Sequence, residues 1–221
     1  MIEAVIIDFD DTLCLTEAAC FEMENETLMA MGREPMPREV HISTWGQPLF
    51  EAIAVRSPGI DVEAFKEAYH PIIAEYTREN KLDVIPDENY KTLDRLIAEM
   101  GKKVLILTSR TYGEVRHMLE PDHLLASRIE GMYHKDNMKY HKPDPRAFNE
   151  LLADHGLRPE YCVYVGDSKG DAISSKAARL SFIASLESGL RQKSDFEPGQ
   201  VDAFIYRFPE LTDAVTALEN R

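Results

Sequence analysis

The stretch that decides the fold is AVIIDFDDT, residues 4–12, in which an apolar run passes directly into a cluster of aspartates. Ala4 to Ile7 has the short, β-branched character of a buried strand. Open α/β sheets bind their ligands at the carboxyl ends of parallel strands, so Asp8 and Asp10 lie where a site is expected. Neighbouring carboxylates repel one another, and a bound cation would relieve that repulsion. The stretch therefore predicts a first strand that ends in a site for a divalent cation.

The rest of the chain alternates short apolar runs with longer amphipathic segments, which is the pattern of parallel strands joined by crossover helices. Strands are predicted at 104–107, 161–165 and 203–206, with weaker candidates at 127–133 and 180–184. Helices are predicted between them at 87–100, 112–119, 145–155, 169–178 and 209–219. We therefore expect an α/β protein with a Rossmann-like, doubly wound parallel sheet as its core.

The interval between the first two strands is far too long for a simple crossover loop. It contains predicted helices at 16–31, 47–55 and 62–79, separated by glycines and prolines. We expect a helical cap at residues 15–84, inserted into a core made of residues 1–14 and 85–221. The segment 15–84 carries 13 acidic and 6 basic residues, a net charge of −7, so it holds half of the excess negative charge of the chain.

The composition excludes several classes of function. The 221 residues include 25 Lys plus Arg against 39 Asp plus Glu, a net charge of −14, which disfavours nonspecific binding to nucleic acid or an anionic membrane. No apolar run approaches the length of a membrane span, and the first residues lack the basic flank of a secretion signal. The three cysteines show no CxxC spacing. These features predict a cytoplasmic protein with neither a nucleic-acid nor a membrane partner.

Two of the other predicted core strands, 104–107 and 161–165, are followed by polar groups suited to a phosphate site. Thr108-Ser109-Arg110 supplies hydroxyls and successive backbone N–H groups that can bind phosphoryl oxygens. Gly166 to Asp171 (GDSKGD) is a glycine turn with two acids four residues apart; one can coordinate a metal, and the other can hold a coordinated water or orient a neighbour. His141 to Pro145 (HKPDP) places Lys142 in a proline-stiffened turn. Together these groups favour a phosphate site over unrelated turns.

The order of these groups resembles that of the haloacid dehalogenase-like hydrolase superfamily, over essentially the whole chain. Asp8-Phe9-Asp10-Asp11-Thr12 resembles the DxDxT motif, Thr108 the Ser/Thr motif, Lys142 the lysine motif and GDSKGD the GDxxxD motif. The inserted helices resemble the phosphatase branch that includes phosphoglycolate phosphatases and β-phosphoglucomutases. Position 11, often glycine in the family, is aspartate here, which a turn tolerates.

The resemblance implies an enzyme that hydrolyses a phosphate ester of a small metabolite, as a monomer or homodimer. Asp8 would be the nucleophile that forms an aspartyl-phosphate, and Asp10 the general acid and then base. Mg²⁺ would be held by Asp8, the backbone carbonyl of Asp10 and Asp167, with Asp171 in support. Thr108, with Ser109 beside it, and Lys142 would bind the phosphoryl oxygens, and Lys142 would also restrain the charge of Asp8. An acid at position 10 favours phosphate esters, because dehalogenases and phosphonate-cleaving relatives lack it.

Two alternatives remain open. The first is a phosphosugar mutase of the same family, although such mutases typically carry a histidine where this chain has Cys20. The second is a phospho-accepting receiver or a noncatalytic binding protein, although a receiver needs about half this length and would place its phosphorylated Asp where Thr108 stands. Substrate selection is expected from the cap loop that contains His41, Trp45 and Gly46, and from Arg110, which could meet a second anionic group.

Overall fold

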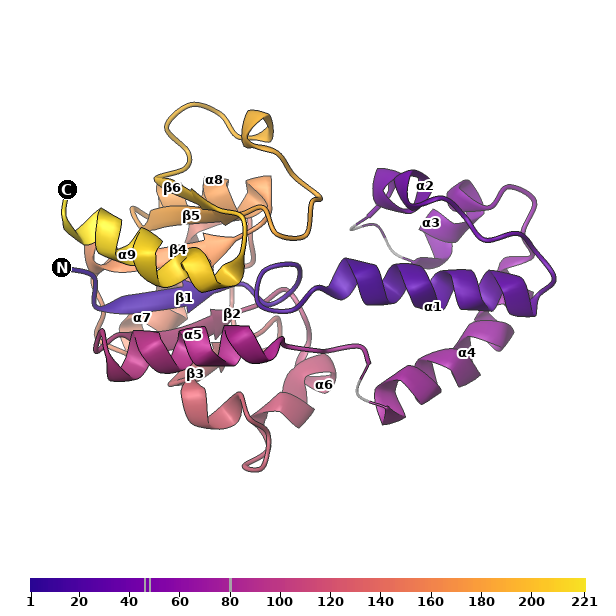
Figure 1. Cartoon of the computed structure of the whole chain (residues 1–221), viewed down its shortest axis with the longest axis horizontal. Helices are drawn as coiled ribbons and strands as arrows, with labels where there is room; N and C mark the ends of the chain where they lie inside the picture. Colours follow the sequence, from indigo (N-terminus) through magenta and orange to yellow (C-terminus); the bar gives the residue numbers. More distant parts are fainter. Residues whose placement is uncertain (46, 48, 80) are drawn as a thin grey trace. The chain divides into compact units, whose positions relative to one another are not determined.

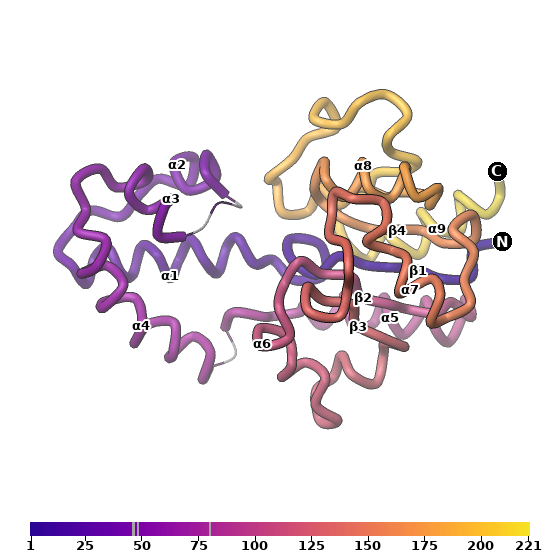
Figure 2. The backbone as a smooth tube through the Cα atoms, turned by 180° about the vertical axis from the view of Figure 1, so that it is seen from behind, coloured from indigo at the N-terminus to yellow at the C-terminus, as the bar shows by residue number. Residues whose placement is uncertain are grey.

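The computed structural model describes residues 1–45, 47, 49–79 and 81–221 (Figure 1). It divides into two compact units, a core unit of Met1–Cys14 with Ile85–Arg221 and a helical unit of Leu15–Val84. The chain leaves the core unit after its first strand and returns to it after the helical unit (Figures 1 and 2). The expected α/β class with a helical insertion is confirmed.

The core unit contains a six-stranded sheet in the order β3-β2-β1-β4-β5-β6, with every neighbouring pair parallel. Its strands are β1 (Ala4–Ile7), β2 (Lys103–Leu107), β3 (Gly131–Tyr133), β4 (Cys162–Gly166), β5 (Ser181–Ser185) and β6 (Ala203–Ile205). In the central strands, Ile7 is in register with Ile106 of β2 and with Val165 of β4. The residues that follow β1, β2 and β4 therefore emerge level with one another at one edge of the sheet.

Helices cover both faces of this sheet, as expected for a doubly wound fold. The helices of the core unit are α5 (Asp87–Ala98), α6 (Tyr112–Val115), α7 (Asn149–Asp154), α8 (Lys169–Ala177) and α9 (Leu211–Glu219). Alternate residues of β1 point to opposite faces. Val5 and Ile7 belong to one apolar cluster with residues of α5 and α9, whereas Ala4 and Ile6 belong to a second cluster with residues of α7 and α8. Burial of both faces explains the continuous apolar run of β1.

Several predicted elements are shorter than expected. The predicted helix at 145–155 begins as a 3₁₀ turn at Pro145–Phe148, where Asp144 caps the turn by accepting a hydrogen bond from the N–H of Arg146, 2.9 Å away. The predicted helix at 112–119 is likewise α6 followed by a 3₁₀ turn. The weak strand at 127–133 is reduced to β3, because residues 126–128 form another 3₁₀ turn. These are boundary errors that leave the sheet topology unchanged.

The helical unit consists of α1 (Thr16–Ala30), α2 (Arg38–Ser43), α3 (Leu49–Arg56) and α4 (Val62–Arg78), and it has an apolar core of its own. The sequence did not predict α2, whose six residues are too few for a helical period to be recognised. His41 was expected in a loop, and that expectation was wrong: it lies in α2 and is fully buried.

An ionic network is buried inside the helical unit. The two ring nitrogens of His41 lie 2.9 Å from Glu17 Oε1 and 3.1 Å from Glu24 Oε1. Each ring nitrogen of His41 therefore faces a carboxylate oxygen of a different glutamate. Arg56 contacts Glu24 at 2.6 Å and donates to the hydroxyl of Thr44 at 2.7 Å. Buried charges are tolerated when they are paired in this way.

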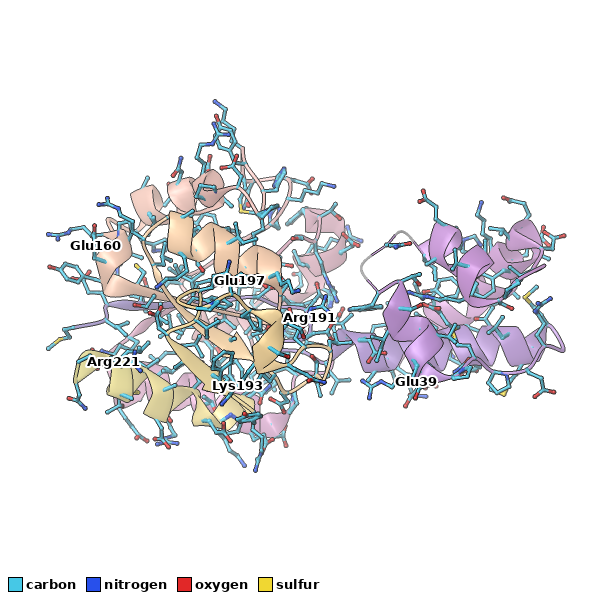
Figure 3. The ribbon with its side chains drawn as sticks, turned by 90° about the horizontal axis from the view of Figure 1, so that it is seen from above. Glu39, Glu160, Arg191, Lys193, Glu197 and Arg221 are labelled. Carbon is cyan, nitrogen blue, oxygen red and sulfur yellow. The ribbon has the colours of Figure 1, made fainter. Side chains whose placement is uncertain are left out.

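Most other charged side chains lie on the surface. Figure 3 labels Glu160, Glu197 and Arg221 of the core unit and Glu39 of the helical unit, all of them exposed. Within the ranges that the structure describes, no helix is long and apolar enough to cross a membrane.

Candidate active site

Three carboxylates converge at the edge of the sheet where β1 and β4 end. Asp8 follows β1, Asp167 follows β4, and Asp171 lies in the first turn of α8. One carboxylate oxygen from each lies within 4.8 Å of the others. Asp8 and Asp171 are buried, and Asp167 is partly exposed. Oxygen ligands in a compact group of this kind are what Mg²⁺ and Ca²⁺ prefer.

Lys142 is the cation beside these carboxylates. Its Nζ lies 2.9 Å from Asp8 Oδ2 and 2.8 Å from Asp171 Oδ1, and it donates to the hydroxyl of Tyr164 at 2.8 Å. The side chain of Lys142 is only 9% exposed, so the ammonium is held inside the site and not in solvent. The family resemblance implies that Lys142 binds phosphoryl oxygens and also restrains the charge of Asp8, and in the structure its ammonium contacts Asp8 directly.

The charges of the site do not balance. Burial raises the pKa of Asp8 to about 8, against the opposing attraction of Lys142, and repulsion from Asp171 adds to the rise. Burial, with repulsion from Asp171 and Asp8, also holds the pKa of Asp167 well above its usual value. Burial has the same tendency at Asp171, but Lys142 and Ser168 outweigh it and lower its pKa. Three carboxyl groups share one ammonium, and a divalent cation would supply the missing positive charge.

Two residues that the sequence analysis did not select hold Asp171 in place. Tyr164 OH lies 3.2 Å from Asp171 Oδ1. Ser168 donates from its hydroxyl at 2.6 Å and from its backbone N–H at 3.0 Å to Oδ2. Ser168 was detectable as the N-cap of an S-x-x-D capping box. Tyr164 gave no signal, because an aromatic residue in a strand is usually part of the core.

The backbone explains two residue choices in the motifs. A Cβ at Gly166 would lie 2.7 Å from both Cγ and Oδ2 of Asp171. Glycine at this position therefore allows the side chain of Asp171 to lie close to the backbone of β4. Asp11 adopts a left-handed backbone with φ of 55°. Glycine prefers this conformation, and aspartate is among the few other residues that adopt it readily, which accounts for aspartate at this turn.

Thr108 and Ser109 follow β2 at the same edge. Thr108 is fully buried, and its N–H donates to the carbonyl of Tyr133 at 2.8 Å. Its hydroxyl oxygen accepts a hydrogen bond from the N–H of Arg110 at 3.2 Å. Ser109 is exposed. Of the two predicted phosphate-binding hydroxyls, Thr108 is therefore the one fixed at the end of the sheet.

Asp10 is paired with Arg110 and does not belong to the three-carboxylate group. Nε of Arg110 lies 3.1 Å from both carboxylate oxygens of Asp10, and Nη2 lies 2.6 Å from Oδ1. The guanidinium carbon lies 4.9 Å from the ring centroid of Phe9. Its place in the sequence suggested that Arg110 could meet a second anionic group of the substrate, and it gave no indication of this ion pair.

The candidate residues of the loop after α2 belong to the helical unit. The ring of Trp45 lies 5.2 Å from that of His41, centroid to centroid, so it packs beside the buried network. Gly46, which the sequence analysis also selected, lies outside the described residues.

Known proteins share this sequence pattern and this fold. The profile of the family described as "Haloacid dehalogenase-like hydrolase" matches residues 5–185. A phosphoglycolate phosphatase of Rhodobacter capsulatus is 27% identical over 90% of this chain and 90% of its own length. A phosphorylated carbohydrates phosphatase of Thermotoga maritima is 25% identical over 90% of this chain and 92% of its own. The crystal structure of a hydrolase from Deinococcus radiodurans, 18% identical, has a similar fold, with a TM-score of 0.81 over 99% of this chain and 96% of its own.

Proposed function

The chain belongs to the haloacid dehalogenase-like hydrolase family, and we propose that it is a Mg²⁺-dependent phosphatase of a small phosphorylated metabolite, acting through an aspartyl-phosphate at Asp8. The observation that carries the proposal is the position of Asp8, buried at the end of a central strand and in contact with Lys142. Two relatives that align over most of this chain are named as phosphatases, which supports the same reaction class.

The donor set fits a magnesium ion. Asp171 already accepts hydrogen bonds at both oxygens, from Lys142 and Tyr164 on one side and from Ser168 on the other. We therefore assign direct binding of Mg²⁺ to Asp8 and Asp167, with the carbonyl of Asp10 as the family resemblance implies, and a supporting role to Asp171. When bound, the cation neutralises the phosphoryl group and the carboxylate that attacks it.

In the first step, a carboxylate oxygen of Asp8 attacks phosphorus and the bond from phosphorus to the ester oxygen breaks. The electron pair of that bond stays on the ester oxygen, which takes a proton from Asp10, so an alcohol leaves. Lys142 is positioned to hold the charge of Asp8, and the hydroxyl of Thr108 lies at the same edge of the sheet for a phosphoryl oxygen. Ser109 would add its backbone N–H.

In the second step, Asp10 takes a proton from a water molecule, whose oxygen attacks the phosphorus of the aspartyl-phosphate. The bond from phosphorus to Asp8 breaks, which releases inorganic phosphate and restores the Asp8 carboxylate. The proton that Asp10 gave to the alcohol is thereby replaced. Because water and not a second sugar phosphate accepts the phosphoryl group, the products distinguish a phosphatase from a mutase.

The test is phosphate release from p-nitrophenyl phosphate and from a panel of phosphorylated metabolites that includes 2-phosphoglycolate and sugar phosphates. We expect activity with Mg²⁺, none with EDTA, and a hydroxylamine-sensitive phosphoryl group on the wild type that Asp8→Asn lacks. Asp122→Asn, which changes an exposed aspartate, is the matched control and should retain activity. Full activity of Asp8→Asn, or no turnover of any ester, would refute the mechanism. Conversion of one sugar phosphate to another without release of phosphate would favour the mutase.

A further inference from the structure

The general acid of the proposed reaction is held by an arginine that the reaction scheme does not use. Asp10 follows β1, Arg110 follows β2, and these neighbouring strands bring residues 100 positions apart in the chain into contact. The side chain of Arg110 is 15% exposed and that of Asp10 is 33% exposed, so the pair faces the accessible side of the site.

The ion pair with Arg110 restricts Asp10 in its proposed role as the general acid. Both carboxylate oxygens accept hydrogen bonds from the guanidinium, at 3.1, 3.1 and 2.6 Å. A general acid must lie within hydrogen-bond distance of the ester oxygen it protonates. Arg110 contacts both carboxylate oxygens and fixes the direction in which the carboxylate points. When Asp10 turns toward the ester oxygen, the ion pair opens.

The guanidinium has a second support that does not depend on Asp10. Its carbon lies 4.9 Å from the centroid of the Phe9 ring, and Phe9 is fully buried. Stacking of a guanidinium on an aromatic face is favourable, because the face of the ring attracts a cation. The backbone of Arg110 is also fixed, since its N–H donates to Thr108 and its carbonyl accepts from Lys135 at 2.8 Å. Arg110 can therefore stay in place when Asp10 moves away.

We propose that Arg110 exchanges partners during turnover, releasing Asp10 and binding an anionic group that the leaving group carries close to its ester oxygen. This inference rests on the proposed function and deepens it. Asp10 protonates the ester oxygen of the leaving group, so a guanidinium in contact with Asp10 can reach an anionic group on the leaving-group side of the substrate. When the leaving group carries a carboxylate, that carboxylate replaces Asp10 as the partner of Arg110. When the leaving group is neutral, the ion pair opens and Arg110 gains no new partner. Arg110 is thus a positioning residue for Asp10 and a specificity residue for the substrate.

The effect on rate follows from the two contacts. A partly exposed ion pair contributes up to about 1 kcal/mol, so opening it without compensation slows a neutral ester by up to about fivefold. A hydrogen-bonded contact between Arg110 and a substrate carboxylate contributes about 1.5–3 kcal/mol, which is about ten- to hundredfold in kcat/KM. Loss of Arg110 should therefore affect the two kinds of ester in opposite directions.

The experiment compares 2-phosphoglycolate with ethyl phosphate, which has a methyl group in place of the carboxylate. For Arg110→Met we expect kcat/KM for 2-phosphoglycolate to fall about ten- to hundredfold and kcat for ethyl phosphate to rise by up to about fivefold. Arg110→Lys keeps the positive charge but loses the bidentate hydrogen-bonding geometry of the guanidinium, so it should retain part of the activity toward 2-phosphoglycolate. This variant tests the proposal even if Arg110→Met does not fold.

The matched control is Arg128→Met. Arg128 pairs with Asp94 at 2.8 and 3.1 Å and lies 5.3 Å from the ring centroid of Tyr90, but it precedes β3 and so lies at the opposite edge of the sheet. Arg128→Met should have the same kcat and kcat/KM as the wild type for both esters. Equal losses for both esters in Arg110→Met, or no preference of the wild type for the anionic ester, would overturn the proposal. Failure of the wild type on every ester, or full activity of Asp8→Asn, would instead refute the proposed function itself.

Discussion

Replacement of Gly166 by alanine should damage both the stability and the chemistry of this protein. The position requires glycine for space and not for backbone freedom, since Gly166 is absent from the glycines that adopt positive φ. An added Cβ would lie 2.7 Å from Cγ and Oδ2 and 2.8 Å from Cβ of Asp171. To restore a normal carbon contact of about 3.5 Å, Asp171 or the backbone at position 166 must move by about 0.8 Å.

Asp171 has little freedom to make that shift. It is fully buried and held by hydrogen bonds of 2.6 to 3.2 Å from Lys142, Tyr164 and Ser168. Overpacking of a dense interior costs about 1–3 kcal/mol, which at about 2–4 °C per kcal/mol lowers the Tm by about 2–12 °C. Displacement of Asp171 also moves Lys142 away from Asp8, and a misplacement of this size costs about ten- to hundredfold in kcat.

Gly170→Ala provides the matched control in the same turn. A Cβ at Gly170 would lie 3.5 Å from Ser168 Oγ and 3.8 Å from Pro143 Cβ, which are ordinary contacts. Gly170 lies in α8, where alanine is favoured over glycine by about 0.5–1 kcal/mol, so the control should be as stable as the wild type or more so. Calorimetry and phosphate release should therefore separate the two variants. Equal Tm and equal kcat for both alanine variants would refute the steric reasoning.

Three further outcomes follow from the charges. Burial opposes ionisation of Glu17, but hydrogen bonds from Arg38 and His41 outweigh it and lower its pKa. The contribution of Glu17 to stability is therefore present above the unfolded pKa and lost as the pH falls through the lower folded value. Glu17→Gln should flatten the loss of stability that circular dichroism records below about pH 4.5. Arg56→Met leaves Glu24 buried without its arginine and should cost about 3–5 kcal/mol in denaturant unfolding, much of which an added Glu24→Met should recover. Asp167→Asn should raise the Mg²⁺ concentration for half-maximal activity by at least about tenfold in a metal titration.

The sequence was sufficient for the parts of this protein that depend on one stretch of chain or on a simple rule of topology. The apolar run that ends at Asp8 predicted a central strand, and the parallel alternation predicted that Thr108 and Asp167 would emerge at the same edge. In a parallel sheet, neighbouring strands that begin at the same level also end at the same level. The residues that follow those strands are therefore expected to lie close together. The family resemblance added the order of the motifs, including Lys142.

The sequence was insufficient where side chains from distant segments compete for partners. Nothing near Arg110 identifies Asp10 as its partner, since the contact depends on the rotamers of both residues. Tyr164 alternates with valines in a strand, so its hydroxyl contact with Asp171 is hidden in an apolar pattern. His41 was assigned to a loop because short helices lack a recognisable period. These contacts are tertiary, and single-sequence patterns report mainly local structure.

The position of β1 in the sheet constrains the order in which the protein can be made. This strand is synthesised first but lies in the middle of the sheet, and its neighbours β2 and β4 begin only at Lys103 and Cys162. A nascent chain on the ribosome can therefore hold a helical unit with its own core while β1 still lacks both partners. Asp8, the proposed nucleophile, meets Asp167 only after β4 has been translated. Catalytic competence thus arrives late in biosynthesis, and a truncated chain that retains the first motif remains inert.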